Sequence, residues 1–423
     1  EATSLYEAAV ATNGPFTRGQ PLQIKGHEGA HIVTQDGRIL LDCNGHVLAH
    51  NMVNDAPIRR HIQEVLEETG TGILAPGMTH PEVDLAKVRI AGMIENEFGG
   101  GSWEVDLMSS GTRANEDSLS VGRAVLGGEQ HVLALREGYH GSGAMRGVVG
   151  HSSWNSRGTL RLGVPMTLLD FVQTDEGRDY TADFYRAMDC NIGADGKPHE
   201  IAEFGEQGVA GFEKLRPKGL KEMIIEIHRR GGFVTGDIVQ TAPLRTGEGI
   251  LAPYGIVDKN DTRTIPDSVT GAKGMGFVGQ PLAFVAFRKA SLQGVDPKHF
   301  GKSYDTNGRN VLAAAAFNAG YEILMDPKFQ ADVRDNMAYW RQGLEGIQQR
   351  LSDRIRRVTG IGYMSGLELD SPKRVADFTR IGATETGIIC AVGGLTGNKL
   401  RLGAKLDSPR AIIDEALNKI EDT

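Results

Sequence analysis

The chain has 423 residues, of which 40% are hydrophobic and 24% are charged, and its formal net charge is −8. This composition is ordinary for a globular protein, and the negative balance disfavours nucleic acid or an anionic membrane as a partner. The sequence contains no run of about 18 apolar residues, so we expect no membrane-spanning helix.

The three cysteines, Cys43, Cys190 and Cys390, are far apart and form no CxxC pair. This pattern predicts reduced thiols in a cytoplasmic protein. The first ten residues, EATSLYEAAV, have neither the basic nor the apolar region of a secretory signal peptide, and we expect none.

In chain order, AHIVTQDGRILLDCNG predicts two short strands around a turn at Asp36-Gly37. Residues 56–68 have the periodicity of a helix. From about residue 80 to residue 290, helix-like runs such as VDLAKVRIAGMIENEF alternate with apolar runs such as VLALRE and LAFVAF. This alternation favours an α/β domain built on a mostly parallel sheet.

Residues 310–350 predict two long helices, and the tail predicts the strands GYMSGLELD and KLRLGAKL and a final amphipathic helix. We therefore expect residues 1–55 to form the N-terminal part of a small α+β domain and residues 56–309 to form a large domain. Residues 310–423 would complete the small domain at the C-terminus.

Two segments suit the binding of a phosphorylated aromatic ligand. The strand-like run VDLM is followed by Ser109-Ser110-Gly111-Thr112, and Asn115 is expected to open a helix. Backbone N–H groups at a helix start attract phosphate, although an ordinary capped turn would give the same pattern. Tyr139 in GYHG offers a ring for stacking, although a half-buried loop tyrosine would look alike.

Two further segments supply an acid and an amine. Asp237 ends the apolar run GFVTGD, and Lys273 lies among small residues in PDSVTGAKGMG. A buried carboxylate needs a partner such as a protonated pyridine nitrogen, and an amine beside apolar walls can act as a nucleophile and a base. In isolation, Asp237 could cap a turn and Lys273 could be a surface lysine. Together the four segments match what pyridoxal 5′-phosphate (PLP) requires.

These residues resemble the class III (fold type I) aminotransferases, most nearly the glutamate-1-semialdehyde aminomutase branch. The similarity extends over segments in the family's order: 17–42, SSGTRANE (109–116), GYHG (138–141), IAEFGEQGVAG (201–211), DIVQTAPLRTG (237–247), PDSVTGAKGMG (266–276), TNGRNVLAAAA (306–316) and LRL (400–402). The resemblance implies the PLP-dependent transferase fold of type I, with residues 56–309 as the PLP-binding domain, and PLP as the cofactor.

The resemblance also implies roles for individual residues. Lys273 would form the Schiff base with PLP and act as general base, and Asp237 would face the pyridinium nitrogen. The other matched positions would be Ser110, Gly111 and Thr112 at the phosphate, Tyr139, His140 and Val239 at the ring, and Gln240 near the phenolic oxygen. Thr306 would reach the phosphate of the partner subunit in a homodimer, and Arg401 would grip a substrate carboxylate.

Several substrate-facing positions differ from the family pattern. Arg113 stands where the family has Glu, Ile238 follows the aspartate, and LAHNMVND (48–55) replaces a GHxHP segment. We therefore expect amino transfer between a small-molecule amine donor and an aldehyde or ketone, with a specialised substrate such as an antibiotic amino sugar. The alternatives are a PLP-dependent epimerase, racemase or aminomutase, an eliminating enzyme on the same fold, and a non-catalytic protein, which retention of Lys273 and Asp237 disfavours.

Other motifs predict no further cofactor. Gly274–Gly279 fits GxGxxG, but the strand-like PLAFVAF follows it where a dinucleotide site needs a helix. The sequence has no HExxH motif and no clustered cysteines and histidines, so we predict no metal site.

Overall fold

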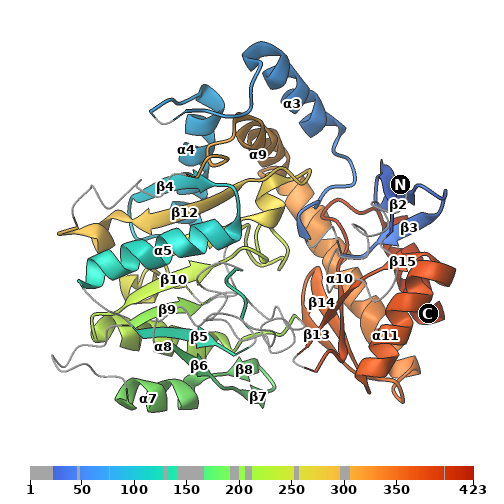
Figure 1. The fold of residues 1–423 in the computed structure, drawn as a ribbon. Helices are drawn as coiled ribbons and strands as arrows, with labels where there is room; N and C mark the ends of the chain where they lie inside the picture. Colours follow the sequence, from blue (N-terminus) through green and yellow to red (C-terminus); the bar gives the residue numbers. More distant parts are fainter. Residues whose placement is uncertain are drawn as a thin grey trace, which may run out of the picture.

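The structure is a computed structural model, and it describes residues 22–44, 48–75, 77–127, 131–136, 138–141, 166–190, 200–204, 212–251, 257–295, 305–394 and 396–423. A seven-stranded sheet occupies the larger part of the molecule (Figure 1) in the order β4-β12-β11-β10-β9-β5-β6. Its strands are β4 (Trp103–Met108), β5 (His131–Leu135), β6 (Met166–Leu169), β9 (Glu200–Phe204), β10 (Phe233–Asp237), β11 (Ser268–Gly271) and β12 (Ala283–Arg288).

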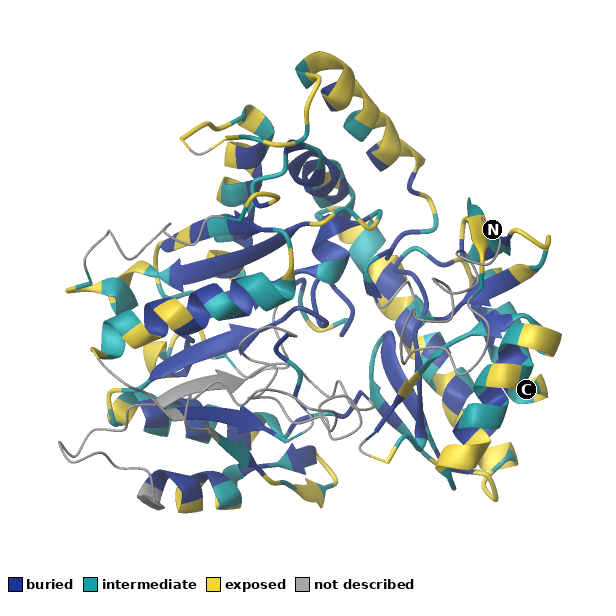
Figure 2. Cartoon of the chain, viewed as in Figure 1, coloured by how far each residue is buried: buried dark blue, intermediate teal, exposed yellow. Residues whose placement is uncertain are grey.

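Only β12 runs against its neighbours in this sheet; the other described pairs are parallel. Because side chains alternate along a strand, neighbouring residues point to opposite faces of the sheet and belong to different hydrophobic clusters. Val132 and Phe233 pack with helix α5 (Gly111–Leu126). Leu133 and Val234 pack with α7 (Thr181–Cys190) and α8 (Pro217–Arg229). Helices thus cover both faces and bury the strands (Figure 2), which confirms the predicted α/β fold.

Helix α5 begins earlier than the sequence indicated. Ser110, and not Asn115, stands at its boundary, and the Ser110 hydroxyl accepts a hydrogen bond from the Arg113 backbone N–H at 3.3 Å. A serine at this position satisfies one of the N–H groups that an unbonded first turn would leave unpaired. Asn115 consequently lies inside the first turns, on the side that faces the sheet, where it is buried.

The two ends of the chain share one sheet. Its order is β1 (Ile24–Glu28), β2 (His31–Thr34), β3 (Ile39–Asp42) and β15 (Ile388–Ile389), with β15 parallel to β3. The expected turn at residues 36–37 joins β2 to β3. An antiparallel sheet beside it has the order β13 (Ile355–Ile361), β14 (Met364–Leu369), β17 (Lys399–Leu402) and β16 (Ala391–Gly393). The first described strands and the C-terminus therefore lie on the same side of the molecule (Figure 1).

The remaining long helices connect these parts. Helix α9 (Val311–Leu324) packs against α3 (Ala56–Thr69) and α4 (Pro81–Phe98), while α10 (Pro327–Arg350) packs against α12 (Arg410–Asp422) and β13. Helix α11 (Pro372–Ile381) and the hairpin of β7 (Val172–Thr174) and β8 (Gly177–Asp179) complete these elements. Within the described ranges, no helix combines the length and apolar character that a membrane span requires.

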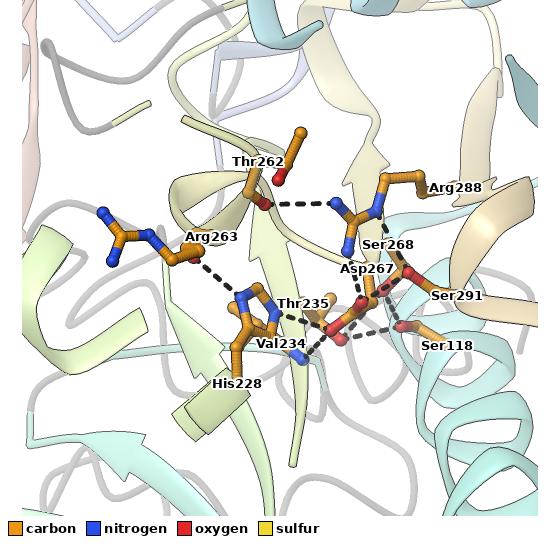
Figure 3. Close-up of polar contacts among 10 residues, drawn as sticks. All are labelled: Ser118, His228, Val234, Thr235, Thr262, Arg263, Asp267, Ser268, Arg288 and Ser291. Carbon is orange, nitrogen blue, oxygen red and sulfur yellow. Dashed lines mark hydrogen bonds and ion pairs between the residues drawn. The ribbon is translucent and has the colours of Figure 1, made fainter. Parts of the chain in front are cut away.

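A polar network fixes one end of β10 and β11 (Figure 3). Asp267, just before β11, is buried and accepts hydrogen bonds from the Val234 N–H at 2.8 Å and from Arg288 at 3.0 Å. His228 lies 2.9 Å from the same carboxylate and binds the Arg263 carbonyl at 2.8 Å. These donors offset the cost of a buried carboxylate. They hold the two strands so that the opposite ends, with Asp237 and Thr270, face the candidate site.

Candidate active site

The carboxyl ends of the central strands open into a cavity of about 330 Å³. This is the edge at which open α/β sheets bind their ligands. Its wall is made of residues from the end of β10, the start of α5 and the segments that follow β4, β5, β10 and β11, namely Ser109, Ser110, Gly111, Thr112, Asn115, Tyr139, His140, Gly141, Asp237, Val239, Ala272 and Lys273, joined by Ala49 and residues 279–282. Most of the predicted site residues are therefore brought to one place.

Lys273 is the first residue of a short 3-10 turn, η3 (Lys273–Gly276), and Ala272 alone separates it from β11. It is half-buried and adopts a left-handed backbone conformation with φ 51°. Residues with a side chain rarely adopt this conformation, which persists where the surroundings enforce it and is often found at functional sites. The lysine thus stands at the cavity on a constrained backbone.

Asp237 ends β10 and is fully buried. Its Oδ2 accepts a hydrogen bond from Asn115 Nδ2 at 2.7 Å and lies 2.8 Å from His140 Nδ1, while its Oδ1 accepts from the Val239 N–H at 2.9 Å. These contacts compensate the loss of water around the carboxylate and fix its plane. Asp237 is therefore a rigid acceptor at the cavity wall.

Asn115 is a site residue whose role the sequence did not reveal. Its Nδ2 also donates to the His140 carbonyl at 3.0 Å, and its Oδ1 accepts a hydrogen bond from the Thr270 hydroxyl at 2.5 Å. Thr270 thereby sets which end of the amide faces Asp237. The available signals were a short polar side chain within a helix and a threonine in a buried strand, and both are common without any functional role.

The first turn of α5 supplies a site for an anion. Ser109, Ser110, Gly111 and Thr112 line the cavity at the N-terminus of this 16-residue helix, where N–H groups and the helix dipole favour negative charge. A side chain at Gly111 would come within 2.9 Å of Val239 Cγ2. Glycine is therefore needed where the helix start, the strand end and the cavity meet.

Asp305 stabilises this turn through hydrogen bonds to Ser109. Its Oδ2 accepts hydrogen bonds from the Ser109 N–H at 2.8 Å and the Ser109 hydroxyl at 2.5 Å. Burial favours the neutral acid, but the bonds from Ser109 and nearby N–H groups outweigh it and lower the pKa of Asp305. Thr306 follows directly; it is exposed and does not line the cavity of its own chain.

Two other predicted residues lie beyond the cavity wall. Gln240 and Arg401 are both buried, and Arg401 Nη2 donates to Gln240 Oε1 at 3.3 Å. The Arg401 guanidinium also lies 4.5 Å above the centre of the Phe212 ring. Arg401 lies on β17 and Gln240 in the loop after β10, and the two side chains contact each other. Neither residue is part of the cavity wall.

A buried ionic cluster holds the segment beside Arg401. Glu213 contacts Lys399 of β17, Arg357 of β13 at 2.6 Å and Arg178 of β8 at 3.5 Å. Burial alone would raise the pKa of Glu213, but the surrounding cations outweigh burial and lower it. The cluster joins the antiparallel sheet to the part of the chain that follows β9.

Among the described residues, no group of three or more His, Cys, Asp or Glu side chains is arranged to hold a metal ion. The ionisable side chains on the described cavity wall are Lys273, Asp237, His140 and Tyr139. The arrangement can bind an anion at the α5 terminus, a protonated ring nitrogen at Asp237, and a carbonyl group at the Lys273 amine.

Comparison with known proteins agrees with this chemistry. The family model described as "Aminotransferase class-III" matches residues 201–423. The mitochondrial alanine–glyoxylate aminotransferase 2 homolog 2 of Arabidopsis thaliana is 26% identical, over 90% of this chain and 78% of that protein. The acetylornithine aminotransferase of Bacillus subtilis strain 168 is 25% identical, over 74% of this chain and 73% of that protein.

The fold is also shared with solved structures. A transaminase from the marine bacterium Virgibacillus superimposes with a TM-score of 0.83 at 18% identity, covering 99% of this chain and 98% of that chain. At this identity the superposition shows that the fold is the same.

Proposed function

Because this chain belongs to the class-III aminotransferase family and is a PLP-dependent aminotransferase, we propose that Lys273, Asp237 and the N-terminus of α5 are the groups that hold and operate its cofactor. The observation that carries the proposal is their convergence on one cavity. PLP, when bound, draws electron density from the carbon that bears the substrate amine.

The residues present fit the cofactor. The first turn of α5 would hold the phosphate, and Gly111 leaves open the space in which a side chain would meet Val239. Asp237 would hold the protonated ring nitrogen, since its carboxylate is buried and already fixed by neutral donors and His140. Tyr139 and Val239 lie on the same wall and would pack on the ring faces.

Lys273 would carry out the proton transfers. Its Nζ would hold the cofactor covalently and would become free when a donor amine takes its place. The free Nζ would then hold and move the proton that leaves the donor carbon, while water would supply the oxygen of the departing carbonyl compound and the amino group would stay in the site. The same atom would run these steps in reverse with an aldehyde or ketone acceptor.

We further propose that the active form is a homodimer, to which Thr306 contributes across the interface. Asp305 anchors the Thr306 loop at Ser109, on the rim of the cavity, while Thr306 itself is exposed. Exposed apolar side chains also gather on α3, α4 and the loop between them, where Leu66, Ile73, Met78, Leu85 and Val88 are 42–69% exposed. A surface of this kind is typical of an interface.

The finer identity of the substrate is also a proposal. Arg401 would recognise the carboxylate of the amine donor, since a guanidinium offers two parallel donors and Gln240 connects it to the wall residue Val239. We place the chain nearest the glutamate-1-semialdehyde aminomutase branch because of the matched segments 109–116, 237–247 and 266–276. We propose a specialised biosynthetic substrate because Arg113, Ile238 and the segment 48–55 depart from the family pattern. The free cysteines Cys43 and Cys390 support a reducing, cytoplasmic setting.

The domain division that we propose puts residues 56–309 in the PLP-binding domain, between small-domain parts at residues 1–55 and 310–423. The sheet that joins β3 to β15 supports the union of the chain ends. Helix α9 begins just after the proposed boundary between residues 309 and 310, and it packs on α3 and α4 of the proposed PLP-binding domain. One hydrophobic core therefore continues across this boundary.

The test is to mix the PLP-loaded enzyme with single candidate amines and to follow the cofactor absorbance. Lasting conversion to the amine form of the cofactor is the expected result for amino transfer. Uptake of solvent deuterium into the amine without such conversion would instead identify an isomerase, and release of a leaving group would identify an eliminating enzyme.

A further inference from the structure

Asn51 joins the N-terminal part of the chain to the turn that carries Lys273, here called the lysine turn (residues 273–277). Asn51 is fully buried, and its Nδ2 donates a hydrogen bond to the Gly274 carbonyl at 2.9 Å. Its backbone N–H donates to the Phe277 carbonyl at 3.3 Å. Phe277 N–H in turn donates to the Gly274 carbonyl at 3.0 Å and closes the turn. A single residue therefore binds both ends of the lysine turn.

The lysine turn has an unusual backbone that needs external support. Lys273 and Phe277 both have φ 51°, in the left-handed region that disfavours residues with a side chain. Such residues keep this conformation only where surrounding contacts enforce it. The space is also tight, since a side chain at Gly274 would lie 2.9 Å from Pro243 Cδ and 3.1 Å from Asn51 Nδ2.

The Asn51 side chain is more than a space filler. Its Oδ1 is buried and has no hydrogen-bond partner among the described residues. A buried acceptor of this kind costs free energy, which a leucine of similar size would avoid. The amide therefore contributes through its other end, the donor to Gly274. The Asn51 carbonyl accepts from the Leu406 N–H at 2.8 Å, which links the lysine turn to the C-terminal segment as well.

We propose that Asn51 is a positioning residue for Lys273. Its side-chain amide and backbone N–H hold the lysine turn in the left-handed conformation that places the Lys273 amine at the cavity. The inference rests on the proposed role of Lys273 as the residue that binds PLP. It concerns the segment 48–55, in which this sequence departs from the pattern of its family.

The test compares Asn51→Leu with a matched control, Asn318→Leu. Asn318 on α9 is also buried, its Nδ2 donates to the Glu82 carbonyl at 2.9 Å, and its Oδ1 is likewise without a partner among the described residues. It does not contact the lysine turn through any of these bonds. Both substitutions remove a buried side-chain amide, and Asn318→Leu also removes the bond from Nδ2 to Glu82 Oε2 at 2.6 Å, so the control is the more disruptive change.

Two measurements follow, and one of them needs no cofactor. Cofactor-free protein is mixed with PLP, samples are reduced with borohydride at intervals, and peptide mapping gives the rate at which Lys273 is labelled. We expect Asn51→Leu to slow labelling roughly tenfold or more, since small misplacements of reacting groups have effects of this size. Hydrogen exchange at the Phe277 amide of cofactor-free protein should become faster. Asn318→Leu should match the wild type in both.

The outcomes separate this inference from the proposed role of Lys273. Wild-type labelling at another lysine would overturn the role of Lys273. Labelling of Lys273 at an unchanged rate in Asn51→Leu, with unchanged exchange, would overturn the role of Asn51. Equal slowing in Asn318→Leu would also overturn it, because general loosening would then explain the effect. If Asn51→Leu does not fold, Asn51→Ser, which keeps a short donor, allows the same comparison.

Discussion

Asn115 Nδ2 lies 2.7 Å from Asp237 Oδ2, and the Thr270 hydroxyl lies 2.5 Å from the other end of the same amide. The three residues come from α5, β10 and β11, so the carboxylate at the cavity is held by the packing of a helix on two strands. Since Thr270 donates to Asn115 Oδ1, the amide can only present its N–H groups to Asp237. The geometry of the carboxylate therefore depends on Asn115 and, through it, on Thr270, which is not part of the cavity wall.

The first prediction is that Asn115→Leu impairs the chemical step. The change removes a hydrogen bond to a buried charged group, which is worth about 1.5–3 kcal/mol. We expect turnover with an amine donor to fall roughly tenfold or more, and PLP to bind more weakly to the cofactor-free protein. Ser118→Ala is the control, since Ser118 lies on the same helix, is buried, and binds Thr235 and Ser268 instead. An equal loss in both variants would assign Asn115 to the stability of α5 alone.

The second prediction concerns Asp237 itself. Asp237→Ala should leave a protein that folds and binds PLP but turns over at least about 10²-fold more slowly, an effect typical of removing a positioned electrostatic group. Asp237→Asn keeps the shape and removes only the charge, and it should lose nearly as much. Single-turnover absorbance measurements would show this directly. Turnover at the wild-type rate in either variant would mean that the ring nitrogen is not held here.

The sequence indicated the fold and the residues that line the cavity more clearly than the residues that support them. Lys273, Asp237 and the Ser110–Thr112 turn stood out because each chemical role demands a particular residue type at a strand end. Asn51, Asn115 and Thr270 act through hydrogen bonds to residues far away in the chain, and one asparagine among many carries no local sign of this. The start of α5 was placed at Asn115 because its cap, Ser110, also fitted a strand-end loop.

The predicted positions of Gln240 and Arg401 show a second limit. The resemblance to the class III family implied a cofactor contact for Gln240 and a substrate contact for Arg401, and the structure pairs the two side chains with each other. That pairing depends on how β17 lies against the loop after β10, a relationship between segments about 160 residues apart that periodicity cannot specify.

The third prediction concerns the network at the other end of the central strands. Burial opposes the charge on His228, but its bond to Asp267 outweighs burial and raises the pKa of His228. The stability that this histidine contributes is fully present below its unfolded pKa and is lost as pH rises through the higher folded value. Burial likewise opposes ionisation of Asp267, yet His228 and its other donors lower the pKa of Asp267. Its contribution is lost as pH falls through that lower value.

His228→Gln should therefore flatten the pH dependence of stability on the side near and above the ordinary histidine value of 6.5. We expect a loss of about 1–3 kcal/mol at slightly acidic pH and a smaller loss in alkaline solution, measured by urea unfolding across that range. The control is His31→Gln, whose parent side chain is 22% exposed and lies 3.0 Å from Glu415. A loss that does not vary with pH would show that His228 contributes by packing alone.

The fourth prediction separates a substrate role of Arg401 from a structural one. The guanidinium is buried, lies over the Phe212 ring and donates to Gln240, so a purely structural role would predict loosening of β17 and equal loss with every substrate. If instead Arg401 binds the donor carboxylate, Arg401→Ala should slow the half-reaction with a carboxylate-bearing donor roughly tenfold or more and spare an acceptor without a carboxylate. Arg401→Lys keeps the charge but not the planar pair of donors, and should recover only part of the loss. Rapid mixing of each partner with the matching cofactor form measures the two half-reactions separately. Equal losses in both would exclude recognition of the donor carboxylate at Arg401.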